Sequence, residues 1–353
     1  MSRFLSCAYA GLEAYSPGEQ PRDKAYIKLN TNESPFPPSE RVVQALNADE
    51  VRDLRLYPDP DCRILKEKLA EAYALKAENV FVSNGSDDIL NFAFMAFAKD
   101  RGAAFPDISY GFYRVYAELH GAKYVTVPLD GQFRILPEDY ASMGRGLIAI
   151  ANPNAPTGLA LTLSQVESIV KSNPDSVVLI DEAYVDFGAE SASGLVTKYD
   201  NLLVVHTYSK SASLAGARLG FALASRALIE DLERIKYSTN PYAINRLTLK
   251  AGVAVIEDAA YYRQNCRRIT ENRAYTIEAL RELGFTVTDS MANFVFAKSD
   301  RIGGEALYRE LRQRGILVRH FTAPRICEYN RITVGTRQDM EALVYAVRDI
   351  LAK

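Results

Sequence analysis

The residues of this chain best suited to chemistry lie in one short segment. Lys210 follows Thr207-Tyr208-Ser209, and Arg218 comes eight residues after the lysine. The lysine stands just beyond the apolar run 202–205, where a buried strand is expected to end. A buried ammonium group is costly unless it is paired or chemically used, and a lysine with a lowered pKa can act as a nucleophile and form a Schiff base. Together with the hydroxyl and guanidinium donors nearby, which suit a phosphate, this lysine meets the needs of pyridoxal phosphate. A surface lysine beside a salt-bridged arginine explains this segment alone equally well.

The bulk properties are those of an ordinary cytoplasmic protein. The 353 residues suit two domains, and the net charge of −2 gives no reason to expect nucleic acid or an anionic membrane as a partner. No apolar run approaches the roughly 18 residues of a membrane span, and the N-terminus lacks the apolar core of a secretory signal. The four cysteines are scattered, which indicates reduced thiols, and the three histidines are not spaced as metal ligands. We therefore expect no metal.

Short apolar runs alternate with amphipathic stretches through the middle of the chain. Near-continuous apolar strands alternating with helices are typical of a largely parallel sheet covered on both faces. Each run is followed directly by a polar or Gly/Pro-rich motif, and ligands of such sheets bind beyond the carboxyl ends of the strands. Five polar motifs are therefore expected at one crevice. The five runs are 80–82, 103–105, 147–151, 177–180 and 202–205.

The pattern changes near Pro241, and an α+β domain with an antiparallel or mixed sheet is expected from there. A long helix is predicted over 261–283 and another over 307–314. The predicted domains are an N-terminal arm (1–30) that packs with the small domain, a large cofactor-binding domain (31–243) and a small C-terminal domain (244–353). Predicted strands of the small domain are 285–288, 293–297, 316–319 and 331–334.

Three strand ends carry further candidates. Gly85-Ser86-Asp87 lies between a strand and a helix, where backbone N–H groups bind phosphate, although a plain turn with a helix cap looks the same. Asp181 ends an apolar strand, where an acid is expected to have a partner such as a protonated pyridine nitrogen; capping of the next helix is the alternative. Tyr110 is placed to stack on an aromatic ring, and the Tyr184 hydroxyl could donate to a phenolic oxygen of a cofactor. With 21 tyrosines in the chain, ordinary packing explains any single one.

Two other residue types stand out. Tyr57 precedes a proline, so its backbone is held extended, which suits a reaching residue or an ordinary turn. Arg331 begins an apolar strand and Arg319 ends another. Arginine binds carboxylate or phosphate with two parallel hydrogen bonds, whereas an arginine at a strand end is usually solvated. The apolar character of the short strand makes the two interpretations of Arg331 about equal.

Taken in order, these motifs resemble the fold type I, aspartate-aminotransferase-like enzymes that depend on pyridoxal phosphate. Within that group the chain is similar to the histidinol-phosphate aminotransferases, over nearly its whole length. The resemblance implies a homodimer that transfers an amino group from L-histidinol phosphate to 2-oxoglutarate in histidine biosynthesis, giving imidazole-acetol phosphate and L-glutamate. The segments that carry it are 29–35, 57–59, 83–88, 181–187 and 331–336, with Asn152-Pro153-Asn154-Ala155-Pro156-Thr157-Gly158.

The resemblance also implies roles for single residues. Lys210 is expected to form the Schiff base with the cofactor and to carry the proton between the substrate's Cα and C4′ of the cofactor. Asp181 is expected to pair with the pyridine nitrogen, Tyr184 to contact the phenolic oxygen and Tyr110 to stack on the ring. The residues expected around the cofactor phosphate are Gly85, Ser86, Asp87, Thr207, Ser209 and Arg218, with Tyr57 from the neighbouring subunit. Arg331 is expected to bind the anionic end of the substrate, with Arg319, Tyr15 and Asn32 as its companions.

The chain departs from the family at two places. Ala155 stands where the family usually has an asparagine that contacts the phenolic oxygen, so either Asn154 turns inward or Tyr184 acts alone; we predict Asn154. Ser211-Ala212-Ser213 replaces the more usual Ala-aromatic sequence after the lysine. These changes keep two alternatives open, an aminotransferase for phenylalanine or tyrosine and a threonine-phosphate decarboxylase. A regulatory module of the same fold is a third, against which the presence of both Lys210 and Asp181 argues.

Overall fold

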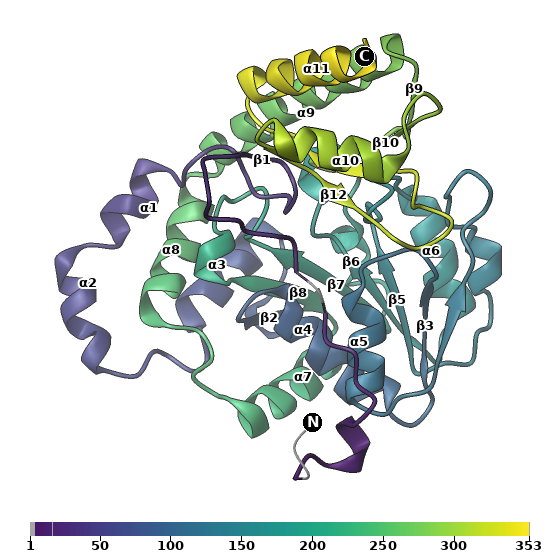
Figure 1. Cartoon of the computed structure of the whole chain (residues 1–353). Coiled ribbons are helices and arrows are strands. Elements are labelled where there is room, and N and C mark those ends of the chain that lie inside the picture. Colours follow the sequence, from purple (N-terminus) through teal and green to yellow (C-terminus); the bar gives the residue numbers. More distant parts are fainter. Residues whose placement is uncertain (1–3, 16, 353) are drawn as a thin grey trace.

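A seven-stranded sheet with helices on both faces forms the larger part of the molecule, and a smaller unit lies above it (Figure 1). The computed structural model describes residues 4–15 and 17–352. Only β8 runs antiparallel to its neighbours. The predicted α/β fold with a mostly parallel sheet is thus confirmed. The strands are, in spatial order, β2 (Val80–Ser83), β8 (Gly220–Ala224), β7 (Leu202–Thr207), β6 (Val177–Asp181), β5 (Leu147–Ala151), β3 (Ala103–Pro106) and β4 (Tyr124–Val127).

The sheet is buried on both faces, which explains why its central strands are apolar without alternation. Successive residues point to opposite faces, so Ile148, Ile180 and Val204 join one core cluster whereas Leu179 and Leu203 join the other. The flanking helices are α3 (Arg63–Ala72), α4 (Ser86–Ala93), α5 (Phe112–Leu119), α6 (Leu163–Ser172), α7 (Arg226–Thr239) and α8 (Arg246–Glu257). Two short helices, α1 (Glu40–Ala45) and α2 (Ala48–Arg52), project from one side (Figure 1).

Two strands of the large sheet did not appear among the predicted ones. β4 is an edge strand that is only partly buried, so it lacks a continuous apolar run. β8 follows Arg218 closely and begins with a glycine. It forms a hairpin with β7, in which Thr207 pairs with Gly220 and the Tyr208 N–H donates to the Leu219 carbonyl at 2.9 Å.

The smaller unit has a four-stranded antiparallel sheet in the order β12-β13-β10-β9, covered by three helices. The N-terminal segment joins this unit, since β1 (Ile27–Lys28) pairs with β11 (Ile316–Leu317). The predicted strand 316–319 is divided between β11 and β12, with Val318 between them. The other elements are β9 (Phe285–Val287), β10 (Phe294–Ser299), β12 (Arg319–His320), β13 (Asn330–Thr333), α9 (Ala259–Glu282), α10 (Gly304–Gln313) and α11 (Arg337–Leu351).

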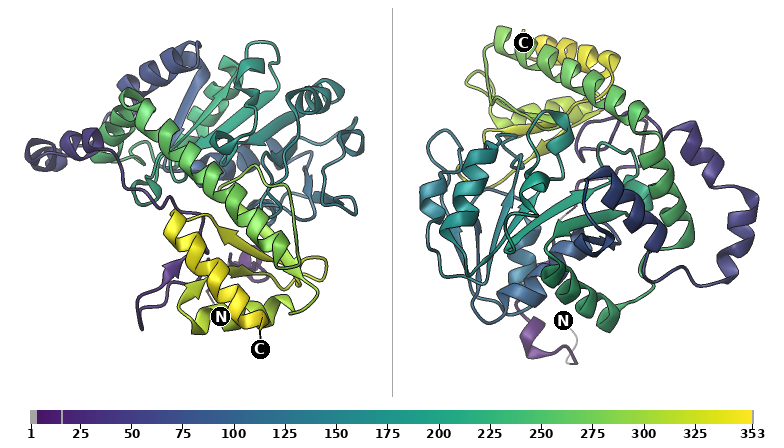
Figure 2. Two further views of the ribbon diagram at one scale, coloured as in Figure 1. Left: turned by 90° about the horizontal axis from the view of Figure 1, so that it is seen from above. Right: turned by 180° about the vertical axis from the view of Figure 1, so that it is seen from behind.

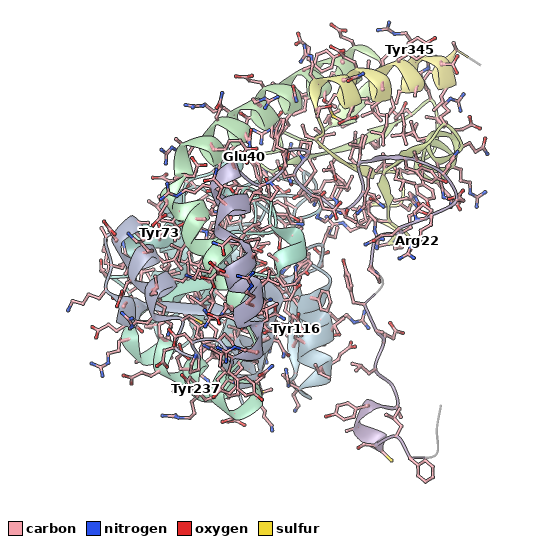
Figure 3. All side chains as sticks on the ribbon, turned by 90° about the vertical axis from the view of Figure 1, so that its left-hand side faces the viewer. Arg22, Glu40, Tyr73, Tyr116, Tyr237 and Tyr345 are labelled. Atoms are coloured by element: carbon pink, nitrogen blue, oxygen red, sulfur yellow. The ribbon has the colours of Figure 1, made fainter. Side chains whose placement is uncertain are left out.

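Helix α9 is one long helix that runs from the large unit along the small one (Figure 2). Helix α8, which the predicted boundary at 243/244 assigns to the small domain, packs against α1 and α3 of the large unit. The N-terminal segment keeps contact with the small unit through Glu19, which pairs with Arg312 of α10. Residues 4–15 lie farther from that unit, and Tyr15 stacks on Phe112 of α5 (Figure 3). Within the described part of the chain, no helix is both long and apolar enough to cross a membrane.

Candidate active site

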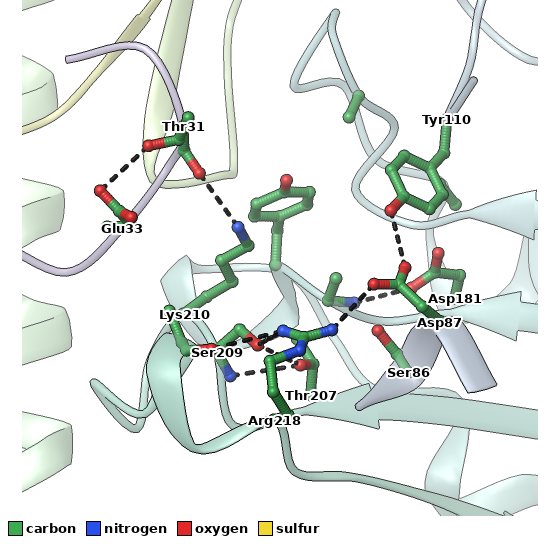
Figure 4. A pocket seen from close by; sticks show the side chains of 15 residues that line it. Thr31, Glu33, Ser86, Asp87, Tyr110, Asp181, Thr207, Ser209, Lys210 and Arg218 are labelled. Atoms are coloured by element: carbon green, nitrogen blue, oxygen red, sulfur yellow. Dashed lines mark hydrogen bonds and ion pairs between the residues drawn. The ribbon is translucent and has the colours of Figure 1, made fainter. Parts of the chain in front are cut away.

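A cavity of about 270 Å³ lies at the carboxyl edge of the large sheet (Figure 4). All five strand-end motifs contribute to its lining, as the sequence predicts, and residues of the N-terminal segment close one side. The lining residues are Thr31, Glu33, Ser86, Asp87, Tyr110, Ala151, Ala155, Asp181, Ala183, Tyr184, Thr207, Ser209, Lys210, Ala215 and Arg218.

Lys210 projects from the β7–β8 connection into this cavity (Figure 4). Its Nζ donates a hydrogen bond to the Thr31 carbonyl at 3.2 Å and lies 5.8 Å from the centre of the Tyr184 ring. Burial, aided by the positive charge of Arg331, lowers the pKa of Lys210 to about 8. At pH 7 roughly a tenth of this amine is therefore in the unprotonated form that a nucleophile requires, far more than for a lysine with the usual pKa of about 10.4.

We expect this lowered pKa to be visible in the reactivity of the protein freed of cofactor. The free amine is the reactive form, so labelling of Lys210 by trinitrobenzenesulfonate should rise with pH around a midpoint of about 8. Exposed Lys198, which is paired with Glu167, should still be mostly protonated at that pH and label slowly. Mass spectrometry of digested samples gives both profiles, and coinciding midpoints would contradict the assignment.

The floor of the cavity has a cluster of donors around Arg218. The residue has a left-handed backbone (φ 57°), and its guanidinium donates to Asp87 Oδ2 at 2.9 Å and to Ser209 Oγ at 3.4 Å. Gly85 has φ 87°, and a Cβ there would come within 2.7 Å of Arg218 Nη2. Only glycine allows this close approach. The start of α4, the hydroxyl of Ser209 and the guanidinium thus fit a phosphate group.

Asp181 ends β6 and lines the cavity as well. The carboxylate is buried and accepts hydrogen bonds from the Tyr113 hydroxyl at 2.9 Å and from the Ala183 N–H at 3.2 Å. Burial raises the pKa of Asp181 to about 6, so the group is still an anion at neutral pH. A buried anion of this kind fits a protonated pyridine nitrogen.

The two predicted aromatic residues also line the cavity. The Tyr110 hydroxyl donates to Asp87 Oδ1 at 2.7 Å, and burial raises the Tyr110 pKa above its usual range. The Tyr184 ring packs edge-on against Phe294, with the ring centres 5.1 Å apart. An amine of lowered pKa, a phosphate-sized donor cluster, a buried anion and aromatic faces therefore surround one space. These residues fit pyridoxal phosphate.

Asn154 does not line the cavity. Its amide donates to the Ile108 carbonyl at 3.0 Å and to Thr157 Oγ1 at 3.2 Å, and its oxygen accepts from Ser109 at 2.8 Å. These contacts tie the side chain into the loop that follows β5. Ala155 faces the cavity instead.

The residues predicted to bind substrate lie around the cavity rather than in its lining. Arg331 donates to the Asn30 carbonyl at 2.9 Å and lies 5.5 Å from the Phe294 ring, while its buried Nε has no hydrogen-bond partner among the described residues. Arg319 donates to the Pro17 carbonyl at 3.2 Å. Tyr15 stacks on Phe112 with ring centres 4.2 Å apart.

Two other predicted residues have different surroundings. Asn32 is buried behind Tyr184, to whose hydroxyl it donates at 3.0 Å. Tyr57 lies outside the cavity of its own chain. It is 79% exposed and stacks on Tyr242 with ring centres 4.5 Å apart.

Tyr113 and Thr31 also belong to the site, although no sequence motif predicted them. Tyr113 lies three residues after Tyr110, about one helical turn, and this spacing was the available signal. The contact of Thr31 with Lys210 uses a backbone carbonyl, which no residue type specifies. Burial of Tyr113 could be expected from its apolar neighbours, but its partner Asp181 is 68 residues away.

Comparison with known proteins identifies the family of the chain. Residues 24–347 match the family described as aminotransferase class I and II. The chain is 51% identical to histidinol-phosphate aminotransferase 2 of Dechloromonas aromatica, over 99% of both chains, and 50% identical to the histidinol-phosphate aminotransferase of Marinomonas sp., over 99% of this chain and 100% of that one. Its fold is similar to the crystal structure of histidinol-phosphate aminotransferase from Sinorhizobium meliloti in complex with pyridoxal-5'-phosphate, with a TM-score of 0.84, 24% identity and coverage of 93% and 92%.

Proposed function

The chain belongs to the class I and II aminotransferase family, and from this premise we propose that it transfers the amino group of L-histidinol phosphate to 2-oxoglutarate. The observation that carries the reaction class is Lys210, with its pKa lowered to about 8, in a cavity that also holds Asp181 and Arg218. The substrate is supported by the names of relatives that share half of their residues with this chain over its whole length. The product then serves histidine biosynthesis.

The cofactor of this reaction is pyridoxal phosphate, which, when bound, supplies an electron sink for negative charge at the substrate's Cα. We assign the ring nitrogen to Asp181, the ring face to Tyr110 and the phenolic oxygen to Tyr184. Lys210 is assigned the covalent attachment. The phosphate is assigned to the N–H groups and side chains of Gly85, Ser86, Asp87, Thr207, Ser209 and Arg218.

Residues of the chain then have separate roles in transamination. Lys210, when free, takes the proton from the substrate's Cα and would deliver it to C4′ of the cofactor. A pKa near 8 allows the amine both to accept and to release a proton near neutral pH. Asp181 keeps a negative charge at one end of the cavity. The carboxylate of Asp181 is buried, which strengthens its attraction for a cation.

Arg331 is assigned the anionic end of each substrate. Its buried Nε lacks a partner among the described residues, and burial lowers the pKa of the guanidinium. An anion would therefore satisfy a donor that otherwise stays unpaired. Guanidinium binds phosphate and carboxylate in the same fork geometry, so one site serves histidinol phosphate and glutamate. Arg319, Tyr15 and Asn32 stay predicted companions.

We propose a homodimer in the cytoplasm as the active form. Tyr57 is 79% exposed beside Tyr242 and does not line its own cavity, which supports a role at the neighbouring subunit's phosphate site. The four cysteines are free, which supports a reducing compartment. The predicted division into domains 1–30, 31–243 and 244–353 stays a proposal.

The substrate is tested with the purified holoenzyme. Glutamate and imidazole-acetol phosphate should yield 2-oxoglutarate, detected in a coupled assay. Turnover of phenylalanine or tyrosine without turnover of the phosphate substrate would favour the aromatic alternative. Release of carbon dioxide from threonine phosphate would instead indicate a decarboxylase.

Replacing Arg331 by lysine is expected to lower kcat/KM for both anionic substrates roughly 10- to 100-fold. A lysine keeps the charge but loses the paired hydrogen bonds, each worth about 1.5–3 kcal/mol with a charged partner. The loss should appear mainly in KM. Arg309→Lys, at an exposed arginine paired with Glu305, is the matched control, and equal effects in the two variants would contradict the role of Arg331.

A further inference from the structure

The side chain of Asn32 joins the N-terminal segment to two other parts of the molecule. Its Nδ2 donates to the Tyr184 hydroxyl at 3.0 Å, and its Oδ1 accepts from the Thr333 hydroxyl at 2.9 Å. Its backbone N–H donates to the same Thr333 oxygen at 2.9 Å. Asn32 is only 1% exposed. The nitrogen and the oxygen of its amide thus each have a protein partner, and the side chain does not line the cavity.

The hydrogen-bond pattern fixes which way the amide of Asn32 faces. A backbone N–H can only donate, so Thr333 Oγ1 accepts from the Asn32 N–H. The Thr333 hydroxyl proton then needs an acceptor of its own. Asn32 Oδ1 takes that proton in the present orientation. With the amide reversed, the buried Thr333 hydroxyl would have no acceptor among the described contacts, a loss that is disfavoured. The Nδ2 group is therefore the one that faces Tyr184.

This orientation fixes the role of the Tyr184 hydroxyl in turn. Because Asn32 has only donors to offer there, the Tyr184 oxygen is the acceptor and its own proton points elsewhere. The bond to Asn32 is the one hydrogen bond that the described residues make with this hydroxyl. Tyr184 lines the cavity, so its proton is left free for an oxygen of a ligand. The Tyr184 hydroxyl can thus donate a hydrogen bond to a ligand in the cavity.

The backbone of Asn32 agrees with this arrangement. It has φ 56°, a left-handed conformation in which asparagine and aspartate are favoured among residues with a side chain. A short amide at this position can reach Thr333 and Tyr184 together. The side chain of Ala155, which also lines the cavity, has no polar atom.

We propose that Asn32 is a positioning residue, which turns the Tyr184 hydroxyl proton toward the cofactor's ring oxygen and so supplies the donor that Ala155 cannot. The inference rests on the proposed function, because it takes the ring oxygen of pyridoxal phosphate as the acceptor. It does not require any contact between Asn32 and the substrate. Three hydrogen bonds in series set the direction of the Tyr184 hydroxyl proton. They run from the Asn32 N–H to Thr333, from Thr333 to the Asn32 amide, and from that amide to Tyr184.

The test measures binding, with a ligand that cannot link covalently to Lys210. Calorimetry gives the dissociation constants of pyridoxamine 5'-phosphate and of its 3-deoxy analogue, which lacks the ring oxygen. The wild-type protein, freed of cofactor, should prefer the ligand with the oxygen by about tenfold. Asn32→Asp has the same shape and tolerates the backbone, but its carboxylate accepts the Tyr184 proton. This variant should bind both ligands about equally, as should Tyr184→Phe.

Three further measurements make the result decisive. Asn32→Asp combined with Tyr184→Phe should add no further change in the preference, and Asn79→Asp, at a side chain that contacts the Ala224 carbonyl far from the cavity, should leave it unchanged. Thr333→Val removes the hydroxyl that holds the amide, and should reduce the preference even if Asn32→Asp does not fold. A preference kept in Asn32→Asp or Thr333→Val, or absent in the wild type, overturns the inference. Failure of the wild type to bind pyridoxamine 5'-phosphate at all overturns the proposed function instead.

Discussion

Replacing Lys210 by alanine is expected to reduce transamination by at least about 10⁴-fold, the upper range for loss of a positioned proton-transfer group. The loss is large because one side chain serves both as the covalent anchor and as the proton carrier. Lys210 is also the one lysine that lines the described cavity, so no other amine can take over either role. The measurement is the single-turnover rate of the purified variant loaded with pyridoxal phosphate.

The covalent role of Lys210 can be checked separately from the rate. Borohydride reduction of the wild-type holoenzyme should leave the cofactor attached to the peptide that contains Lys210, and to no peptide in Lys210→Ala. Lys198→Ala, at an exposed lysine paired with Glu167, should behave as the wild type in both assays. Attachment to another lysine would refute the assignment.

Replacing Asp181 by asparagine is expected to lower kcat by roughly 10²- to 10⁴-fold. Asparagine has the same shape but no charge, so a protonated ring nitrogen would lose its buried partner, and breaking such a pair costs about 3–5 kcal/mol. The loss should fall on kcat more than on KM, because Asp181 lies at the cofactor side of the cavity and Arg331 is the assigned substrate contact. Steady-state kinetics with the phosphate substrate measure both.

The hydrogen bond from Tyr113 gives a second way to test Asp181. This bond lowers the pKa of the carboxylate and so opposes the larger effect of burial. Tyr113→Phe should raise the Asp181 pKa, and because activity needs the ionised form, the acid limb of the pH profile should move to higher pH. Asp186→Asn, at an exposed carboxylate five residues along the chain, is the control.

For the Asp181→Asn variant, a kcat within tenfold of the wild type would contradict the role of Asp181 as the partner of the ring nitrogen.

The strand-end motifs could be predicted from sequence because their signals are local. An apolar run followed by Gly, Pro or a polar residue identifies both the strand and the edge at which its loop emerges, and this was enough to bring Asp87, Asp181 and Lys210 to one cavity. Strand β4 was missed because it lies half exposed at the edge of the sheet, and β8 because it begins with a glycine soon after Arg218.

The partners of the site residues could not be predicted in the same way. Asn32 meets Thr333 across 301 positions of the chain, and that contact depends on how the N-terminal segment joins the small unit. The sequence suggested Asn32 as a substrate contact and Asn154 as a cofactor contact, whereas in the structure their amides are held by Tyr184 and Thr333 and by the loop after β5, respectively. Motif identity indicates that a residue belongs near a site, but the hydrogen bonds that surround it decide which atom it offers.

The β7–β8 hairpin has a consequence for how this segment can vary in length. Lys210 and Arg218 stand on one closed connection, in which Tyr208 pairs with Leu219 and the Leu214 N–H donates to the Tyr208 carbonyl at 3.0 Å. One inserted residue would shift the Arg218 guanidinium relative to Gly85, against which it lies so closely that a Cβ would come within 2.7 Å of Nη2. Insertions and deletions between the two residues are therefore expected to disrupt the site. The eight-residue spacing fixes the distance between the Lys210 amine and the phosphate site at Arg218.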